Sequence, residues 1–227
     1  MKEPDHSFPE IQKQGVYNAI YQRRDMRRFL TDPIPEEVLM RILNAGHQAG
    51  SVGLMQPWNF LIIQEPAVKS QIKNHFLKCN EEAARVYSGE KQALYRDLKL
   101  EGIEEAPINI AVTCDFSRKG PFVLGTQTMP LTALFSTCCA IQNLWLAARA
   151  EGVGMGWVSI LNPIEVKSCL EIPESIELVA YLCLGYVESF PDRPLLEEIG
   201  WEKKLSVNGF IYYNQWGNIK KDTGLPR

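Results

Sequence analysis

The sequence lacks the signatures of several common sites. Its six cysteines form no Cys-x-x-Cys pair and it has only three histidines, so we expect neither a disulfide framework nor a metal site. No Gly-x-Gly-x-x-Gly motif follows an expected strand, and the sequence has no Gly-Lys-Ser/Thr phosphate loop and no Gly-x-Ser-x-Gly elbow. These absences argue against dinucleotide-binding folds, nucleotide triphosphatases and serine hydrolases.

Strong net charge and long apolar runs are also missing. The formal net charge of −3 over 227 residues gives no reason to expect nucleic acid or an anionic membrane as a partner. No apolar run approaches the ~20 residues that cross a bilayer. Residues 1–14 are polar and lack the hydrophobic segment of a signal peptide. We therefore expect a cytoplasmic protein.

The composition of the chain suggests three parts. Residues 1–14 are expected to form a flexible N-terminal arm, and residues 15–190 the main domain. Residues 191–227 are polar and proline-marked but carry aromatic side chains at Trp201, Phe210, Tyr212, Tyr213 and Trp216. This C-terminal extension is expected to pack on a partner subunit, because so many aromatic residues need a surface to bury them.

An arginine cluster marks the segment Gln22–Asp32, whose sequence is QRRDMRRFLTD. Guanidinium groups suit a phosphate because they offer two donors in a fixed geometry and keep their charge. The alternative is that the arginines complement the C-terminal end of the preceding helix through its dipole. Asp25, an acid among arginines, is either a functional group or a salt-bridge partner.

Apolar periodicity predicts alternating helices and strands. Helices are expected over residues 15–23, 35–48, 67–88, 90–105, 131–151 and 162–170, and extended segments over 59–64, 107–115, 154–160 and 176–187. The helix over 131–151 is apolar on several faces, which favours a subunit interface. Two glycine-containing loops, over 49–58 and 154–159, allow close backbone approach to a ligand; alternatively, each is an ordinary turn.

Three motifs in order carry a family resemblance: RRDMR (Arg23–Arg27), HQAGSVGLMQPW (His47–Trp58) and EGVGMGWVS (Glu151–Ser159). Together they resemble the flavin-dependent nitroreductase superfamily, and within it the 5,6-dimethylbenzimidazole synthase branch, over residues 15–190. Asp25, where typical nitroreductases carry a small hydroxyl residue, and Ser159 after Gly-Trp-Val favour that branch. Gly50 departs from the proline usual before Ser51.

The resemblance implies an α+β fold, a three-layer sandwich with a mixed sheet, in an intertwined homodimer. The arginines Arg23, Arg24 and Arg27 would hold the flavin phosphate and ribityl side, and Asp25 and Ser159 would be catalytic. Ser51 and the segment from Gly53 to Gln56 would come from the other subunit, and Lys99 from a helical lid. The full set implied for FMN binding is Arg23, Arg24, Asp25, Met26, Arg27, Ser51, Gly53, Met55, Gln56, Lys99, Trp157 and Ser159.

The activity implied by the resemblance is the oxygen-dependent fragmentation of reduced FMN. The products would be 5,6-dimethylbenzimidazole, the lower ligand of vitamin B12, and erythrose 4-phosphate. FMN is then the substrate, O2 the co-substrate, and a separate NAD(P)H-dependent flavin reductase the supplier. The main alternative is a conventional NAD(P)H nitroreductase or flavin reductase that keeps its FMN. A deiodinase-like enzyme, with Glu90, Tyr95 and Lys99 gripping an amino acid, and a flavin carrier without chemistry are further alternatives.

Overall fold

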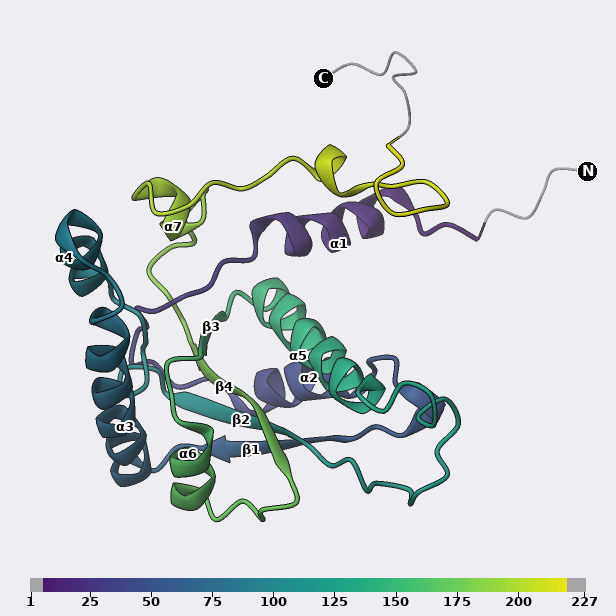
Figure 1. The fold of residues 1–227 in the computed structure, drawn as a ribbon, viewed down its shortest axis with the longest axis horizontal. Helices are drawn as coiled ribbons and strands as arrows, with labels where there is room; N and C mark the ends of the chain where they lie inside the picture. The colour runs from purple at the N-terminus through teal and green to yellow at the C-terminus, as the bar shows by residue number, and fades with distance from the viewer. Residues whose placement is uncertain (1–5, 220–227) are drawn as a thin grey trace, which may run out of the picture. The chain divides into compact units, whose positions relative to one another are not determined.

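The computed structural model describes residues 6–219, and the chain divides after Phe190 into two compact units. The first unit is an α+β fold (Figure 1). Its helices are α1 (Glu10–Gln22), α2 (Glu36–His47), α3 (Pro66–Ala84), α4 (Gly89–Asp97), α5 (Thr132–Ala150) and α6 (Pro163–Cys169). Its strands are β1 (Trp58–Ile63), β2 (Ile108–Cys114), β3 (Gly154–Val158) and β4 (Glu177–Gly185). The second unit contains the short helical segments α7 (Leu195–Glu198) and η2 (Val207–Phe210).

The four strands form one sheet in the order β1-β2-β4-β3. Every pair of neighbouring strands is antiparallel, so the α+β class is confirmed but the sheet is not the mixed sheet that was expected. Two helices, α3 and α4, connect β1 to β2 and return the chain in the opposite direction. Strands β2 and β3 do run the same way on either side of α5, but β4 inserts between them. A parallel pairing is found at the isolated bridge between Asp25 and Met155.

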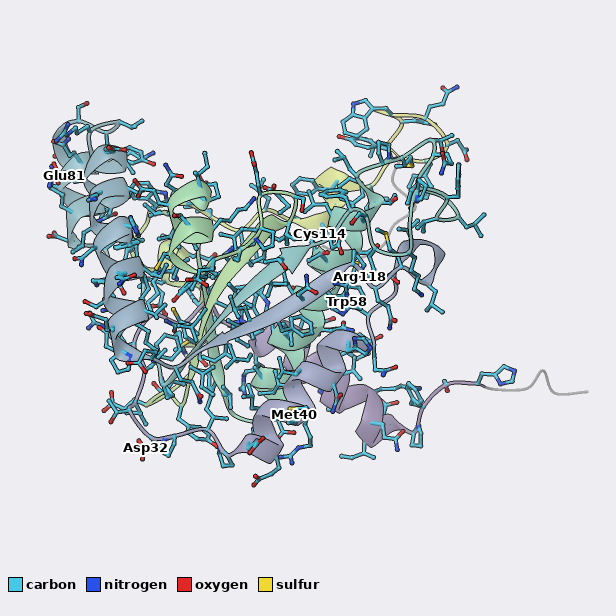
Figure 2. The ribbon with its side chains drawn as sticks, turned by 90° about the horizontal axis from the view of Figure 1, so that it is seen from below. Asp32, Met40, Trp58, Glu81, Cys114 and Arg118 are labelled. Atoms are coloured by element: carbon cyan, nitrogen blue, oxygen red, sulfur yellow. The ribbon has the colours of Figure 1, made fainter. Side chains whose placement is uncertain are left out.

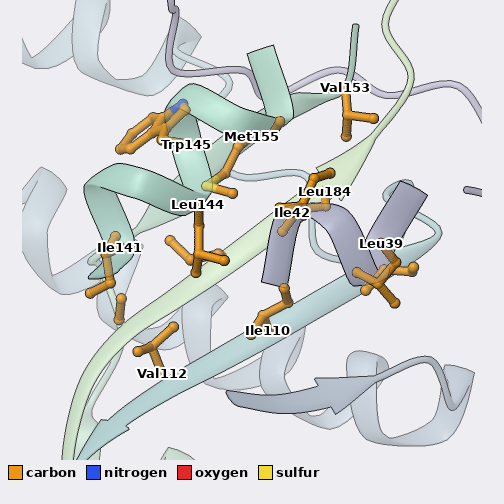
Figure 3. Close-up of a cluster of buried hydrophobic side chains, with 14 of the residues drawn as sticks. Leu39, Ile42, Ile110, Val112, Ile141, Leu144, Trp145, Val153, Met155 and Leu184 are labelled. Atoms are coloured by element: carbon orange, nitrogen blue, oxygen red, sulfur yellow. The ribbon is translucent and has the colours of Figure 1, made fainter. Parts of the chain in front are cut away.

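The sheet has a helical layer on each face, as the three-layer prediction requires. On one face, α2 and α5 bury a large cluster against the sheet, which includes Ile42, Leu144 and Leu184 (Figure 3). On the other face, α3 and α6 bury a second cluster that includes Ile72 and Val166. All seven residues of β2 are buried, because successive side chains of a central strand point into opposite clusters.

A glycine on α2 lets the two helices of the larger cluster approach closely. A Cβ atom at Gly46 would lie 2.6 Å from Cδ2 of Leu144 on α5. Any larger residue would therefore push α2 away from α5 and open the core that supports β3 and β4.

Two helix boundaries differ by five or more positions from those predicted. Helix α1 begins at Glu10, five positions before the expected start. Helix α4 ends at Asp97, so residues 98–105 are not helical as expected. There the side chain of Glu101 accepts a hydrogen bond from the backbone N of Ile103 at 2.7 Å, and Gly102 lies against Phe29. These tertiary contacts outweigh the helical propensity of a highly charged stretch.

Helices long and apolar enough to cross a membrane do not occur between residues 6 and 219.

Candidate active site

The segment Arg23–Arg27 leaves α1 in an extended conformation and lies alongside β3. The backbone N of Met26 donates to the carbonyl of Met155 at 2.9 Å, and Asp25 forms a parallel bridge with Met155. Gly156 permits this approach, because a Cβ atom there would lie 2.0 Å from the Met26 carbonyl oxygen. The glycine-rich sequence of β3 thus positions the arginine cluster and Asp25 against the sheet.

The Asp25 carboxylate is fixed by two donors. Its Oδ1 accepts from the backbone N of Trp157 at 3.0 Å, and its Oδ2 accepts from Nη2 of Arg27 at 2.5 Å. The Asp25 side chain retains 34% of its exposure, so a ligand can still reach it. The carboxylate is therefore held in one orientation and open to chemistry on one side.

The arginines of the cluster have different partners. Nη1 of Arg24 donates to the carbonyls of Tyr21 and Arg23 at 2.8 and 2.7 Å, so Arg24 does complement the end of α1. The guanidinium of Arg23 lies 4.8 Å above the Trp145 ring centre. Arg27 pairs with Asp25, and its Nε is buried without a hydrogen-bond partner among the described residues. The helix-end explanation of the cluster thus holds for Arg24, and phosphate binding by Arg23 and Arg27 stays a prediction.

The C-terminal half of α5 anchors this segment. The indole Nε1 of Trp145 donates to the Arg24 carbonyl at 3.2 Å. One turn later, Arg149 donates to the backbone carbonyl and the side-chain oxygen of Gln22 at 3.3 and 3.0 Å. The helix predicted over residues 131–151 therefore holds the segment on which the predicted site residues lie.

Ser159 is brought to the same part of the sheet. It is exposed and lies two positions after Trp157, whose backbone N binds Asp25. With Trp157, Leu161 and Leu178 it lines a cavity of ≈ 230 Å³. Asp25 and Trp157 are thus in direct contact, Ser159 follows the end of β3, and its role beside Asp25 stays a prediction.

The loop from Ser51 to Gln56 has a strained and tightly held backbone. Gly53, Leu54 and Gln56 have φ of 51°, 51° and 48°, a left-handed conformation that costs about 1–2 kcal/mol for a residue with a side chain. Oγ of Ser51 accepts from the backbone N of Gln56 at 3.1 Å. Met55 is buried, so the loop is anchored in the core at this point.

Two cationic side chains that were not predicted as site residues, Arg118 and Lys119, hold the same loop. Arg118 donates to the carbonyls of Gln56 and Trp58, both at 3.2 Å, and Lys119 donates to the carbonyl of Leu54. Figure 2 shows Arg118 and Trp58 close together at this end of β1. Nothing in the local sequence identifies these contacts, since each joins residues about 60 positions apart.

Within one chain, the Ser51 loop and the Asp25 segment are held by different ends of α5. The backbone N of Val52 donates to Oγ of Ser136 at 3.0 Å, whereas Trp145 binds Arg24. Nine positions of α-helix separate Ser136 from Trp145, about 13 Å along the axis. The structure therefore places the two predicted groups of FMN ligands apart in a single chain.

Lys99 forms ion pairs within its own chain. It contacts Glu105, and it lies 3.4 Å from Oε1 of Glu101. Burial lowers the pKa of Lys99, but the two carboxylates together raise that pKa by more than burial lowers it, so the net shift is upward.

Glu101 is 3% exposed and also pairs with Lys73. Burial tends to raise the pKa of Glu101, but hydrogen bonds from Lys73 and Ile103 lower it overall. Lys99 is thus committed to a cluster of charges, and its role as a flavin ligand stays a prediction.

Between residues 6 and 219, no three or more His, Cys, Asp or Glu side chains are grouped so that they could hold a metal ion.

Comparisons with known proteins place this geometry in a family. The model described as "Nitroreductase family" matches residues 20–186. A protein of Rhodospirillum rubrum named 5,6-dimethylbenzimidazole synthase is 43% identical over 188 residues, covering 82% of this chain and 89% of that protein. One of the same name from Rhodobacter capsulatus is 38% identical, covering 88% and 96%. The solved structure of oxidized iodotyrosine deiodinase bound to FMN and 3-iodo-L-tyrosine is 22% identical with a TM-score of 0.69, covering 88% of this chain and 100% of that one.

Proposed function

The chain belongs to the nitroreductase family, and from this premise we propose that it makes 5,6-dimethylbenzimidazole, the lower ligand of vitamin B12, from reduced FMN and O2. Two relatives that bear the name of this synthase support the product. The observation that carries the proposal is the Asp25 carboxylate, fixed between Trp157 and Arg27 within the arginine cluster. Fragmentation of the flavin would release erythrose 4-phosphate as the second product.

The residues of the arginine segment fit a phosphorylated flavin. The buried Nε of Arg27 has no partner among the described residues, and an unpaired buried donor is costly unless a ligand satisfies it. The Arg23 guanidinium lies over the Trp145 ring, with Cζ 4.8 Å from the ring centre, and its N–H groups would bind an anion. Arg23 and Arg27 would thus hold the phosphate and ribityl oxygens, with Arg24 fixing the backbone between them.

Asp25 and Ser159 would act on the reacting side of the molecule. Reduced FMN supplies both the electrons for O2 and the carbon skeleton of the product. Asp25 would take a proton from the ribityl carbon, because its carboxylate is oriented and still partly exposed. Ser159 would orient the ring edge from the position just after β3, and α4 would exclude water from the site.

We further propose that the site is completed by a second copy of the chain. The outer face of α5 exposes Leu131, Phe135, Cys138 and Cys139, a largely apolar stripe typical of an interface. Within one chain, the α5 residues that hold the Ser51 loop and the Asp25 segment are about 13 Å apart along the helix, and we propose that a partner's loop reaches Asp25 instead. The packing of residues 191–219 on that partner remains part of this proposal, and residues 220–227 of the extension lie outside the described residues.

The first prediction concerns the oligomeric state of the chain. The chain should be a dimer that does not dissociate at micromolar concentration, measured by light scattering. A monomeric mass together with retained FMN binding would contradict the shared site.

The activity itself is tested by mixing the protein with reduced FMN in air. We expect 5,6-dimethylbenzimidazole to be detected by mass, and no oxidation of NADPH unless a flavin reductase is added. Reduction of nitroarenes with NADPH, without any dimethylbenzimidazole, would instead assign the chain to conventional nitroreductases.

The third prediction concerns the contribution of Arg23 to FMN affinity. Arg23→Ala should weaken FMN binding by about 1.5–3 kcal/mol, the range for hydrogen bonds to a charged group. Riboflavin, which lacks the phosphate, should bind poorly to the parent and be little affected. Arg85→Ala, which removes an exposed arginine at the end of α3, is the control for lost charge alone. Unchanged FMN affinity in Arg23→Ala would make Arg23 a helix-end residue.

A further inference from the structure

Trp145 contacts the arginine segment through both its ring and its N–H group. It lies in the C-terminal half of α5 and is 8% exposed, at the edge of the larger core cluster (Figure 3). Its Nε1 donates to the carbonyl of Arg24 at 3.2 Å. Its ring supports the guanidinium of Arg23, whose Cζ is 4.8 Å from the ring centre. One side chain therefore holds the backbone of Arg24 and the guanidinium of Arg23, the residue before it.

The same ring also contacts the strand that holds Asp25. The rings of Trp145 and Trp157 are 6.5 Å apart at 47°, within the range of favourable aromatic pairs. The backbone N of Trp157 in turn donates to Oδ1 of Asp25. Trp145 thus lies between the residues expected to hold the phosphate and the residue expected to carry the chemistry.

We propose that Trp145 is a positioning residue that sets the Arg23 guanidinium for the FMN phosphate and keeps that site in register with Asp25. The identity of the ligand rests on the proposed function. A guanidinium that packs over an aromatic ring keeps N–H donors with which it can bind a phosphate. A bidentate phosphate contact needs both donors in one plane, and a rigid indole below them limits their rotation.

Two substitutions separate the ring from the N–H group. Trp145→Phe keeps an aromatic face for Arg23 but removes the donor to Arg24, and Trp145→Leu removes both. Binding of oxidised FMN and of riboflavin is followed by flavin fluorescence on the full chain. We expect the Kd for FMN to rise about 5-fold in Trp145→Phe and about 30-fold in Trp145→Leu, the range of one neutral hydrogen bond and of that bond plus a cation–π contact. The Kd for riboflavin should change less than about 2-fold, so the preference for FMN shrinks.

The matched control loosens the same end of α5 without touching the arginine segment. Arg41 makes a two-donor contact with Glu151, the C-cap of α5, with both distances 2.8 Å. Arg41→Gln should lower the melting temperature but leave the ratio of FMN to riboflavin affinity unchanged. A purely structural Trp145 would instead weaken both ligands equally, or change the ratio no more than Arg41→Gln does.

The outcomes distinguish this inference from the proposed activity. If the parent prefers FMN and loses that preference in the Trp145 variants, yet makes no dimethylbenzimidazole, the positioning role holds and the activity is wrong. If the parent does not prefer FMN over riboflavin, the positioning role is wrong. Failure of both variants to fold, judged by far-ultraviolet circular dichroism, would make Trp145 a core residue and overturn the inference as well.

Discussion

Asp25→Asn should lower the formation of 5,6-dimethylbenzimidazole by at least ~10²-fold, the low end of what a positioned general base contributes. FMN should still bind, and reduced FMN should still be oxidised by air. The reason is that fragmentation needs a proton to be moved at carbon on the ribityl side, whereas electron transfer from the flavin to oxygen does not. Product is measured by mass and bound flavin by fluorescence in the same samples.

Asp25 also forms an ion pair with Arg27, which the substitution would break. Asparagine can still accept from the backbone N of Trp157, but its amide group would face Nη2 of Arg27, donor against donor. The substitution therefore removes both the base and an ion pair. Arg27→Gln breaks the same pair from the other side and leaves the carboxylate in place, so it is the matched control.

Comparison of the two variants separates the two roles. If Asp25 is the base, Asp25→Asn loses far more product than Arg27→Gln at saturating FMN. Equal losses would mean that the ion pair is what matters, and the parent rate in Asp25→Asn would make Asp25 a structural partner only. Ser159→Ala should lower product formation less, since it removes an orienting hydroxyl and no proton acceptor.

The parts of the molecule predicted from the sequence are those encoded by local pattern. The apolar stretch around Leu144 predicts a helix over residues 131–151, and the segment 107–115 is predicted to be extended; a helix and a strand are observed there. The motif containing Asp25 and the one containing Trp157 predict a common site, and a hydrogen bond of 3.0 Å joins those two residues.

The parts that were missed depend on contacts between distant positions. In the sequence, Trp145 is one of several apolar residues on a helix face. Its role could not be predicted, because its partner Arg24 is 121 positions away. Arg118 and Lys119 were assigned no role from the sequence, although they donate hydrogen bonds to carbonyls of the Ser51 loop. The early end of α4 follows likewise from Gly102 lying against Phe29, which no local propensity encodes.

Gly156→Ala should damage both the stability and the activity of the chain. The added Cβ would lie 2.0 Å from the Met26 carbonyl oxygen and 3.2 Å from its carbon. These are backbone atoms, so no side-chain rotation relieves the clash, and the segment Arg23–Arg27 must move off β3. That movement would break the 2.9 Å hydrogen bond from Met26 to Met155 and draw Asp25 away from Trp157. We expect a cost of about 2–3 kcal/mol, typical of overpacking in a core, a melting temperature lower by roughly 5–10 °C, and no detectable dimethylbenzimidazole.

The control for Gly156→Ala is a glycine with space around it. A Cβ atom at Gly15 on α1 has no heavy atom within 4 Å outside its own helix backbone and chain neighbours, and alanine favours a helix over glycine by about 1 kcal/mol. Gly15→Ala should therefore keep or slightly raise the melting temperature and keep the parent activity, measured by calorimetry and by product mass. If Gly156→Ala matched the parent in both measurements, the close packing of Met26 on β3 would be wrong, and with it the position of Asp25. If stability fell but product formation were retained, the packing would hold, but the fixed orientation of Asp25 would not be needed for the chemistry.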